Sequence, residues 1–170
     1  GFENGNGLDK NRVGVIIGNS LNGEFTRANV MRLRWPYVNK VFVNTMETLG
    51  YKEHEIQEIL DELEVNYKRP FPVPNADTLA GGLSNTIAGR ICNYFDFKGG
   101  GFTVDGACSS SLLAITQGCE SILTERLQVA LVGGVDLSID PFELVGFARN
   151  GALAKEDMQV YGENSQGFWP

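Results

Sequence analysis

Short apolar runs alternate with amphipathic stretches along the chain, and this order predicts strands alternating with helices. The β-branched run within Arg12–Gly18 predicts a short buried strand. Further strands are expected at Phe102–Val104 and Gln128–Val135. Because these runs are almost continuously apolar, they favour a mostly parallel, covered sheet. The fold class indicated is therefore α/β.

Lys52–Tyr67 is the clearest amphipathic helix in the sequence. Its apolar residues recur at helical spacing, and acidic residues occupy most of the remaining positions (Ile56, Ile59, Leu60 and Leu63 against Glu53, Glu55, Glu58, Asp61, Glu62 and Glu64). A solvated acidic face is the simpler interpretation. A docking face for a basic partner is the alternative.

Two further helices are expected around the middle of the chain. Thr86–Phe95 follows an N-cap at Ser84 or Asn85. Ser109–Leu123 has apolar residues around most of its circumference, which predicts a buried helix.

Loops and breaks are indicated between these elements. Asn19–Arg27 is polar and contains glycine, so a loop is predicted there. Within Ala28–Thr48, a helix must end or begin near Trp35-Pro36. The prolines of Arg69–Pro74 predict an extended connector.

Composition and charge narrow the class of protein. The 170 residues are 42% hydrophobic, which excludes a disordered chain, and 21 of them are glycine without a collagen period. The net charge of −7 argues against nucleic acid as a partner. No apolar run approaches the roughly 20 residues of a membrane-spanning helix. The first residues do not resemble a signal peptide, and the chain lacks an initiator methionine and a polar tail, so a fragment of a longer protein is expected.

The three cysteines indicate reduced thiols in a cytoplasmic protein. Cys92, Cys108 and Cys119 are odd in number and form no C-x-x-C pair, so neither a disulfide framework nor a zinc site is expected. Cys92 and Cys119 lie within predicted helices on apolar faces, which favours a structural role for both.

The segment from Val104 to Ser111 carries the candidate chemistry. It joins a predicted strand to a predicted helix, as a nucleophile elbow does, and the small residues Gly106 and Ala107 permit a sharp turn. Cys108 then lies at a helix N-terminus, where unpaired amides favour a thiolate able to form a thioester. Its backbone N–H is a candidate oxyanion donor. From spacing alone, a small buried cysteine is an equally good interpretation.

The motif G-A-C-S-S-S-L at Gly106–Leu112 resembles the active-site motif of β-ketoacyl synthases, the condensing enzymes of fatty-acid and polyketide assembly. The resemblance extends in order through four further segments (Asn85–Asp96, Ala130–Asp136, Asp140–Leu153 and Tyr161–Pro170). It covers nearly everything from Val13 onward. It favours Cys108 as the nucleophile over a structural cysteine.

Within this family, the phrases T-L-A-G-G-L-S-N-T-I-A-G-R-I-C-N and G-G-G-F-T-V-D-G-A-C resemble iterative type I polyketide synthases of the enediyne and polyene types and polyunsaturated-fatty-acid synthases. Gly106 stands where many relatives have threonine. Residues from about 47 to 77 resemble an insertion of this subfamily. The resemblance implies a thiolase-like fold of layered α-β-α-β-α architecture, of which residues 1–170 would form most of the N-terminal half.

The resemblance also implies a reaction in two stages. An acyl group moves from the phosphopantetheine arm of an acyl carrier protein to Cys108, and malonyl-carrier protein is then decarboxylated and condensed with it. The family binds the malonyl thioester with two histidines and a lysine from its C-terminal half. His54, the only histidine, matches neither of them, so the chain alone is expected to be inactive. The implied protein is a homodimer that binds no cofactor directly.

Supporting residues are expected around the nucleophile. Asp105 is a candidate acceptor of amide hydrogen bonds in the elbow, and the serines from Ser109 to Ser111 are candidate helix caps or first-turn residues. Gly146 and Phe147 resemble the loop beside the family's acyl pocket, where a large side chain can gate the acyl chain. Core packing is the alternative for Phe147.

Three other functions compete with the condensing enzyme. One is a non-catalytic dimer partner of the chain-length-factor type, which lacks the nucleophile that Cys108 supplies here. Another is an interaction module that docks through its acidic helix. The third is a thiolase-fold condenser that uses coenzyme A esters, although S-S-S-L and N-T-I-A-G-R-I favour the class that uses carrier proteins.

Overall fold

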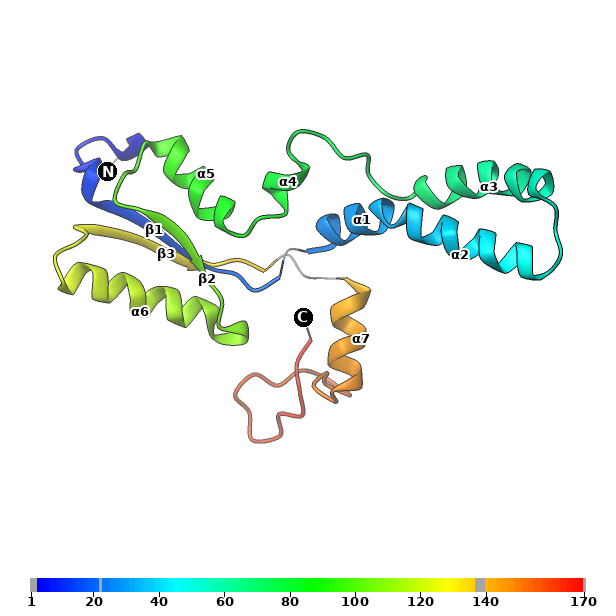
Figure 1. Cartoon of the computed structure of the whole chain (residues 1–170). Coiled ribbons are helices and arrows are strands. Elements are labelled where there is room, and N and C mark those ends of the chain that lie inside the picture. The colour runs from blue at the N-terminus through cyan, green and yellow to red at the C-terminus, as the bar shows by residue number, and fades with distance from the viewer. Residues whose placement is uncertain (1–2, 22, 137–139, 170) are drawn as a thin grey trace.

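The computed structural model describes residues 3–21, 23–136 and 140–169. Asn22, from the predicted loop, and Pro170, from the last resembling segment, lie outside these residues. The fold consists of a small sheet flanked by helices, a projecting helical arm and a C-terminal segment (Figure 1).

The sheet confirms the predicted strands and their parallel arrangement. β1 (Val13–Gly18) lies between β2 (Gly101–Val104) and β3 (Val129–Gly134), and all described pairings are parallel. Val15 is opposite Gly101 on one side and Leu131 on the other. β1 is therefore the central strand, and its residues are among the most deeply buried of the fold.

Two helices lie on opposite faces of the sheet (Figure 1). α5 (Asn85–Phe95) packs on one face, where Ala88 joins the buried side chains of Val13 and Val15. α6 (Ser110–Leu123) packs on the other. Successive residues of β1 thus face α5 and α6 in turn, because side chains alternate between the two faces of a strand.

Glycines let α6 approach the sheet closely. A Cβ built on Gly18 would lie 2.6 Å from the backbone nitrogen of Ser111, and one on Gly134 would lie 2.8 Å from the Cβ of Ser111. Within α6, a Cβ on Gly118 would lie 2.5 Å from Cγ1 of Val132. Gly18 therefore lets the backbones of β1 and α6 meet, and Gly118 makes room on α6 for the side chain of Val132.

The prediction that α6 is buried all round was wrong. Its buried residues are the small ones, and its large apolar side chains are exposed in this chain (Ser110, Ala114, Gly118 and Ser121 against Leu112, Leu113, Ile115, Ile122 and Leu123). Small residues fit under the helix because the sheet is so near. β3 also differs from its predicted burial, since Leu131 and Val132 are about two-fifths exposed (40% and 39%). Exposed apolar area of this extent is typical of a surface that another polypeptide segment covers.

Part of the predicted loop is helical. α1 (Gly23–Leu33) begins within Asn19–Arg27, because tertiary contacts outweigh the weak local signal. Asn29 is buried and its amide donates to the carbonyl of Phe25, and Arg27 reaches two carboxylates far along the chain. The expected break is confirmed, since α2 (Trp35–Thr48) begins at Trp35 with proline in its first turn.

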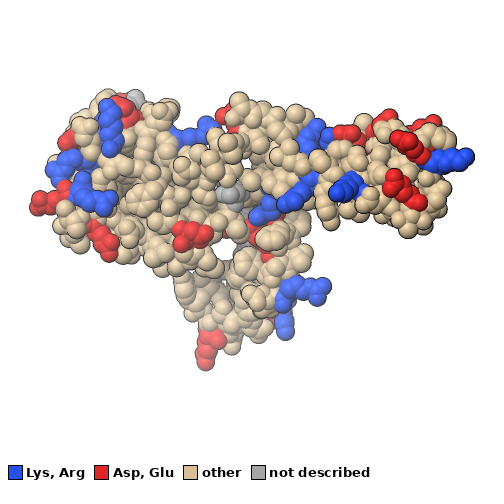
Figure 2. Space-filling model, viewed as in Figure 1, with Lys and Arg blue, Asp and Glu red and all other residues tan. Residues whose placement is uncertain are grey.

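α2 and α3 (Glu53–Lys68) form a helical hairpin that projects from the sheet (Figure 1). Trp35, Ile56 and Leu60 are buried together in a second, smaller core. The hairpin spans Trp35–Lys68, and α3 buries its apolar stripe against α2. Acidic side chains gather over α3, interspersed with basic ones (Figure 2), and the solvated acidic face is confirmed for most of its positions.

The remaining segments connect these parts. The connector Arg69–Pro74 has neither helix nor strand, as predicted, and leads to the short helix α4 (Thr78–Gly81) before α5. Short 3-10 turns occur at Glu3–Gly5 (η1), Lys10–Arg12 (η2) and Ala107–Ser109 (η3). α7 (Pro141–Arg149) precedes a segment in which Leu153 forms a bridge with Phe168. Within the described ranges, each helix is too short or too polar to cross a membrane.

Replacing Gly18 with alanine is expected to destabilise the protein by about 1–3 kcal/mol, because the new methyl group would meet the backbone of α6. Gly133→Ala is the matched control, since a Cβ on this strand residue would meet nothing within 4 Å. Urea denaturation of both variants measures the difference. Equal stability of the two variants would show that α6 does not approach β1 as closely as described.

Candidate functional site

The turn between β2 and α6 contains a strained residue directly before Cys108. Ala107 has φ +52°, in the left-handed region, which costs a residue with a side chain about 1–2 kcal/mol. Cys108 follows in the turn η3, and α6 begins at Ser110. The predicted location of Cys108 at a helix N-terminus is therefore confirmed, and backbone strain of this kind often occurs at functional sites.

Asp105 holds the strained turn. One oxygen of its carboxylate accepts the backbone N–H of Ala107 at 2.9 Å and the hydroxyl of Ser20 at 2.7 Å. These two hydrogen bonds, the amide's first, lower the pKa of Asp105 from its ordinary value. Asp105 therefore accepts a backbone amide within the turn, as expected from the sequence.

Ser110 forms hydrogen bonds to two residues of the turn. The sequence did not distinguish it from the neighbouring serines. Its hydroxyl donates to the carbonyl of Ala107 at 2.6 Å and accepts the N–H of Gly106 at 3.0 Å. The Oγ of Ser20, which follows β1, lies 3.2 Å away. Three adjacent serines gave no signal to distinguish the one that faces inward. Which serine faces inward depends on the rotation of α6 about its axis relative to the sheet.

The role expected for Gly106 was only partly right. Its φ is −138°, so it is Ala107, not Gly106, that takes the left-handed conformation. Glycine at position 106 leaves room for the side chains of Leu113 and Ser109. A Cβ there would clash with the Cδ1 of Leu113 and lie 2.9 Å from the Oγ of Ser109.

Ser109 occupies the N-cap position of α6, but its side chain makes no capping hydrogen bond. Its hydroxyl donates back to the carbonyl of Gly106 at 2.7 Å. The expectation that Ser109 caps the helix with its side chain was therefore wrong, and Ser109 lies just before the first turn of α6, which begins at Ser110.

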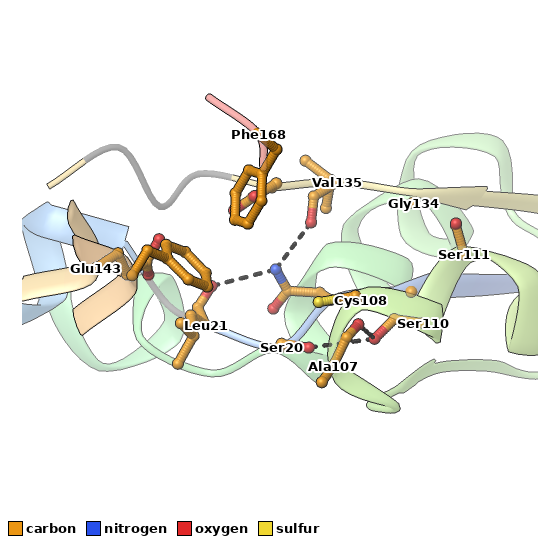
Figure 3. A pocket seen from close by; sticks show the side chains of 14 residues that line it. Ser20, Leu21, Ala107, Cys108, Ser110, Ser111, Gly134, Val135, Glu143 and Phe168 are labelled. Carbon is orange, nitrogen blue, oxygen red and sulfur yellow. Dashed lines mark hydrogen bonds between the residues drawn. The ribbon is translucent and has the colours of Figure 1, made fainter. Parts of the chain in front are cut away.

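Cys108 is exposed and lines a pocket of about 630 Å³ (Figure 3). This volume is within the ordinary range for sites that bind small molecules. The walls come from the ends of β1 and β3, the η3 turn, α7 and the C-terminal segment (Gly18, Asn19, Ser20, Leu21, Ala107, Cys108, Ser110, Ser111, Gly134, Val135, Asp136, Glu143, Phe147 and Phe168). Ligand sites at the carboxyl ends of parallel strands are the rule for α/β sheets.

An aromatic pair forms part of the wall. Phe147 of α7 packs edge-to-face on Phe168, with ring centroids 4.9 Å apart, and both line the pocket. Gly146 is exposed and is not among the lining residues, so the structure brings Phe147 to the pocket but not Gly146.

Asn19 is a buried polar residue of the pocket that sequence reasoning missed. Its amide donates to the carbonyls of Leu21 at 3.2 Å and Val135 at 3.0 Å, which joins the ends of β1 and β3 (Figure 3). Its side chain is 5% exposed. The sequence placed Asn19 in a polar loop, where asparagine is common, so it carried no distinguishing signal.

A buried ion-pair cluster adjoins the pocket and was also missed. Arg27 of α1 pairs with Asp140 and Glu143 at the start of α7. Burial alone would raise the pKa of Asp140, but the hydrogen bonds from Arg27 and from the Glu143 amide outweigh it and hold that pKa below its ordinary value. These residues are more than a hundred positions apart, so no local pattern could have paired them.

The other candidate groups lie elsewhere. Cys92 belongs to α5 and packs against the core, where burial raises the pKa of its thiol. Cys119 is exposed on α6, so its predicted burial was wrong, and it does not line the pocket. His54 is exposed on α3. Of the three cysteines, Cys108 alone lines this pocket.

Comparison with curated proteins finds polyketide synthases. The chain is 44% identical over 68 residues to the non-reducing polyketide synthase pigA of Monascus ruber, matching 40% of this chain and 2% of that protein. It is 40% identical over 102 residues to the probable polyketide synthase 28 of Dictyostelium discoideum, matching 59% of this chain and 4% of that protein. The chain thus spans only a small part of these relatives.

A solved structure shares the fold. The oxazolomycin ketosynthase domain OzmH KS7 of Streptomyces albus JA3453 matches with a TM-score of 0.56 and 22% identity, over 92% of this chain and 21% of that chain. The α/β, thiolase-like fold is therefore confirmed. The family described as "Beta-ketoacyl synthase, N-terminal domain" matches residues 3–170, and the chain belongs to this family.

Proposed function

We propose that Cys108 is the nucleophile of a β-ketoacyl synthase of polyketide assembly. The observation that carries this proposal is the location of its exposed thiol, at the start of a helix and in a pocket with aromatic and aliphatic walls. Unpaired amides at a helix N-terminus favour an anion, and the apolar walls suit an acyl chain.

The first stage is transfer of an acyl group to Cys108. The thiolate attacks the thioester carbonyl of an acylated carrier protein, and the phosphopantetheine thiolate leaves as its bond to the carbonyl breaks. Asp105 and Ser110 hold the turn that presents the thiol. The backbone N–H of Cys108 is the candidate donor to the oxyanion that forms during this step. Preorganisation of this kind avoids rearrangement at the moment of reaction.

The second stage is condensation with malonyl-carrier protein. Loss of carbon dioxide leaves a carbanion, which attacks the thioester on Cys108, and the Cys108 thiolate leaves. His54 is the only histidine of the chain and is exposed on the arm, so these residues supply no imidazole to the pocket. The groups that bind and decarboxylate the malonyl thioester must come from outside them.

The finer assignments rest on sequence resemblance. We assign the chain to the iterative enediyne, polyene and polyunsaturated-fatty-acid type, with residues 1–170 as most of the N-terminal half of a dimeric condensing domain. Its partners would be acyl carrier proteins that carry the phosphopantetheine arm. Free cysteines are typical of a reducing compartment and support a cytoplasmic location.

Cys108→Ala is expected to abolish acyl loading in the full-length protein while leaving its stability almost unchanged, because an exposed thiol contributes little packing. Mass spectrometry after incubation with an acyl-carrier thioester should locate the adduct on Cys108. Cys119→Ala is the control, since this exposed cysteine does not line the pocket. An adduct on Cys92 or Cys119 would refute the assignment.

Gly106→Val is expected to slow acylation of Cys108 strongly and to reduce stability by about 1–3 kcal/mol, because the side chain would clash with Leu113 and displace the turn. Gly133→Val is the control, because a Cβ at this strand position would meet nothing within 4 Å. Single-turnover acylation and thermal unfolding measure the two effects. Acylation of Gly106→Val at the wild-type rate would contradict the proposed geometry.

Residues 1–170 alone are expected to form no β-ketoacyl product from malonyl-carrier protein. A helix N-terminus contributes only about 0.3–2 kcal/mol, whereas an enzyme must lower its barrier by about 8 kcal/mol or more. Product analysis by mass spectrometry measures turnover against a reaction without protein. Product that exceeds this background and disappears in Cys108→Ala would show that these residues suffice.

A further inference from the structure

The ion-pair cluster of Arg27, Asp140 and Glu143 joins two elements that otherwise meet little. Arg27 Nη2 donates to Oε1 of Glu143 at 2.8 Å, and its Nε donates to Asp140. Its guanidinium also lies over the ring of Phe142, 5.1 Å from the centroid. Asp140 and Glu143 are 3% and 6% exposed, so both carboxylates depend on this one described cation for charge compensation.

The cluster controls where α7 begins. Oδ1 of Asp140 accepts the backbone N–H of Glu143 at 3.1 Å and thereby caps the helix, while its other oxygen accepts from Arg27. Within the described residues, α7 packs broadly against no other helix or strand. The position of the first turn of α7 is therefore set largely by its bonds to α1.

The same helix carries part of the pocket wall. Glu143 and Phe147 are four residues apart, on one face of α7, and both line the pocket. Phe147 in turn contacts Phe168. In Figure 3, Glu143 and Leu21 lie at the end of the pocket away from Ser110 and Ser111, with Cys108 between. A shift of α7 would therefore move the aromatic wall relative to the thiol.

We propose that Arg27 is a positioning residue that fixes α7 through Asp140 and Glu143 and so determines the length of acyl chain that Cys108 accepts. This proposal rests on the proposed function of Cys108 as the nucleophile that becomes acylated. Arg27 touches no substrate. It acts through Phe147, which lines the same pocket as Cys108 and packs on Phe168. A hydrophobic pocket discriminates by roughly 10–200-fold for each methylene gained or lost, so a small displacement of the wall has a measurable effect.

The test compares acylation of Cys108 in the full-length protein by acetyl, hexanoyl and dodecanoyl pantetheine thioesters. Arg27→Gln removes the charge, and Arg27→Lys keeps it but lacks the second branch that reaches Glu143. We expect the dodecanoyl-to-acetyl ratio of kcat/KM to change by about tenfold in Arg27→Gln and less in Arg27→Lys. Arg90→Gln is the matched control, because Arg90 forms an exposed ion pair with Asp77.

A double variant separates positioning from general stability. If Arg27 acts through Phe147, Arg27→Gln should leave the acyl-chain ratio unchanged in a Phe147→Ala background. Equal loss of acylation for all three thioesters would overturn the proposal and indicate a purely structural ion pair. An unchanged ratio in both Arg27 variants would overturn it too. If Arg27→Gln does not fold, the ratio in Arg27→Lys decides.

Failure of the underlying function would look different. A wild-type protein that forms no adduct on Cys108 with any of the thioesters would refute the function and this proposal together. A wild-type protein that is acylated, with chain-length ratios unaffected by Arg27, would refute only the role of Arg27.

Discussion

At the carboxyl end of β1, the backbone of Gly18 lies against the backbone of α6 at Ser110 and Ser111, with no room for a Cβ between them. This approach places the first turn of α6 directly over the edge of the sheet. Gly134 of β3 makes a similar approach to Ser111. The other features of the site follow from it, because Cys108 immediately precedes that turn and is carried to the pocket by it.

The connection from β2 to α6 must therefore reverse within a few residues, and the strain falls on Ala107. Its left-handed conformation is maintained by hydrogen bonds from two directions. Asp105 accepts the amide of Ala107, and Ser110 donates to its carbonyl. Ser20 connects both residues to the end of β1. The thiol is thus presented by a short network that involves both neighbouring strands and the helix.

The opposite wall of the pocket depends on electrostatics. Asp140 and Glu143 are buried, and burial of a carboxylate is costly unless a cation compensates for it. Arg27 provides that compensation from α1, the helix that leads into the hairpin of α2 and α3. The arm has its own small core around Trp35, yet through Arg27 it is joined to the helix that carries Phe147. The projecting helices α2 and α3 (Figure 1) are in this way connected through α1 to the pocket.

The sequence by itself determined the parallel α/β arrangement, the strands, the amphipathic helix Glu53–Lys68 and the location of Cys108 at a strand-to-helix turn. These features depend on periodicity and small residues within short windows, so local patterns suffice. Tertiary structure decided which serine faces inward, that Gly106 lies against the side chain of Leu113, that Gly23–Leu33 is helical, and that Arg27 meets Asp140 and Glu143. It also decided that α6 buries its small residues and exposes its large ones. Each of these depends on the rotation and distance of elements far apart in the chain, which no local window of residues contains.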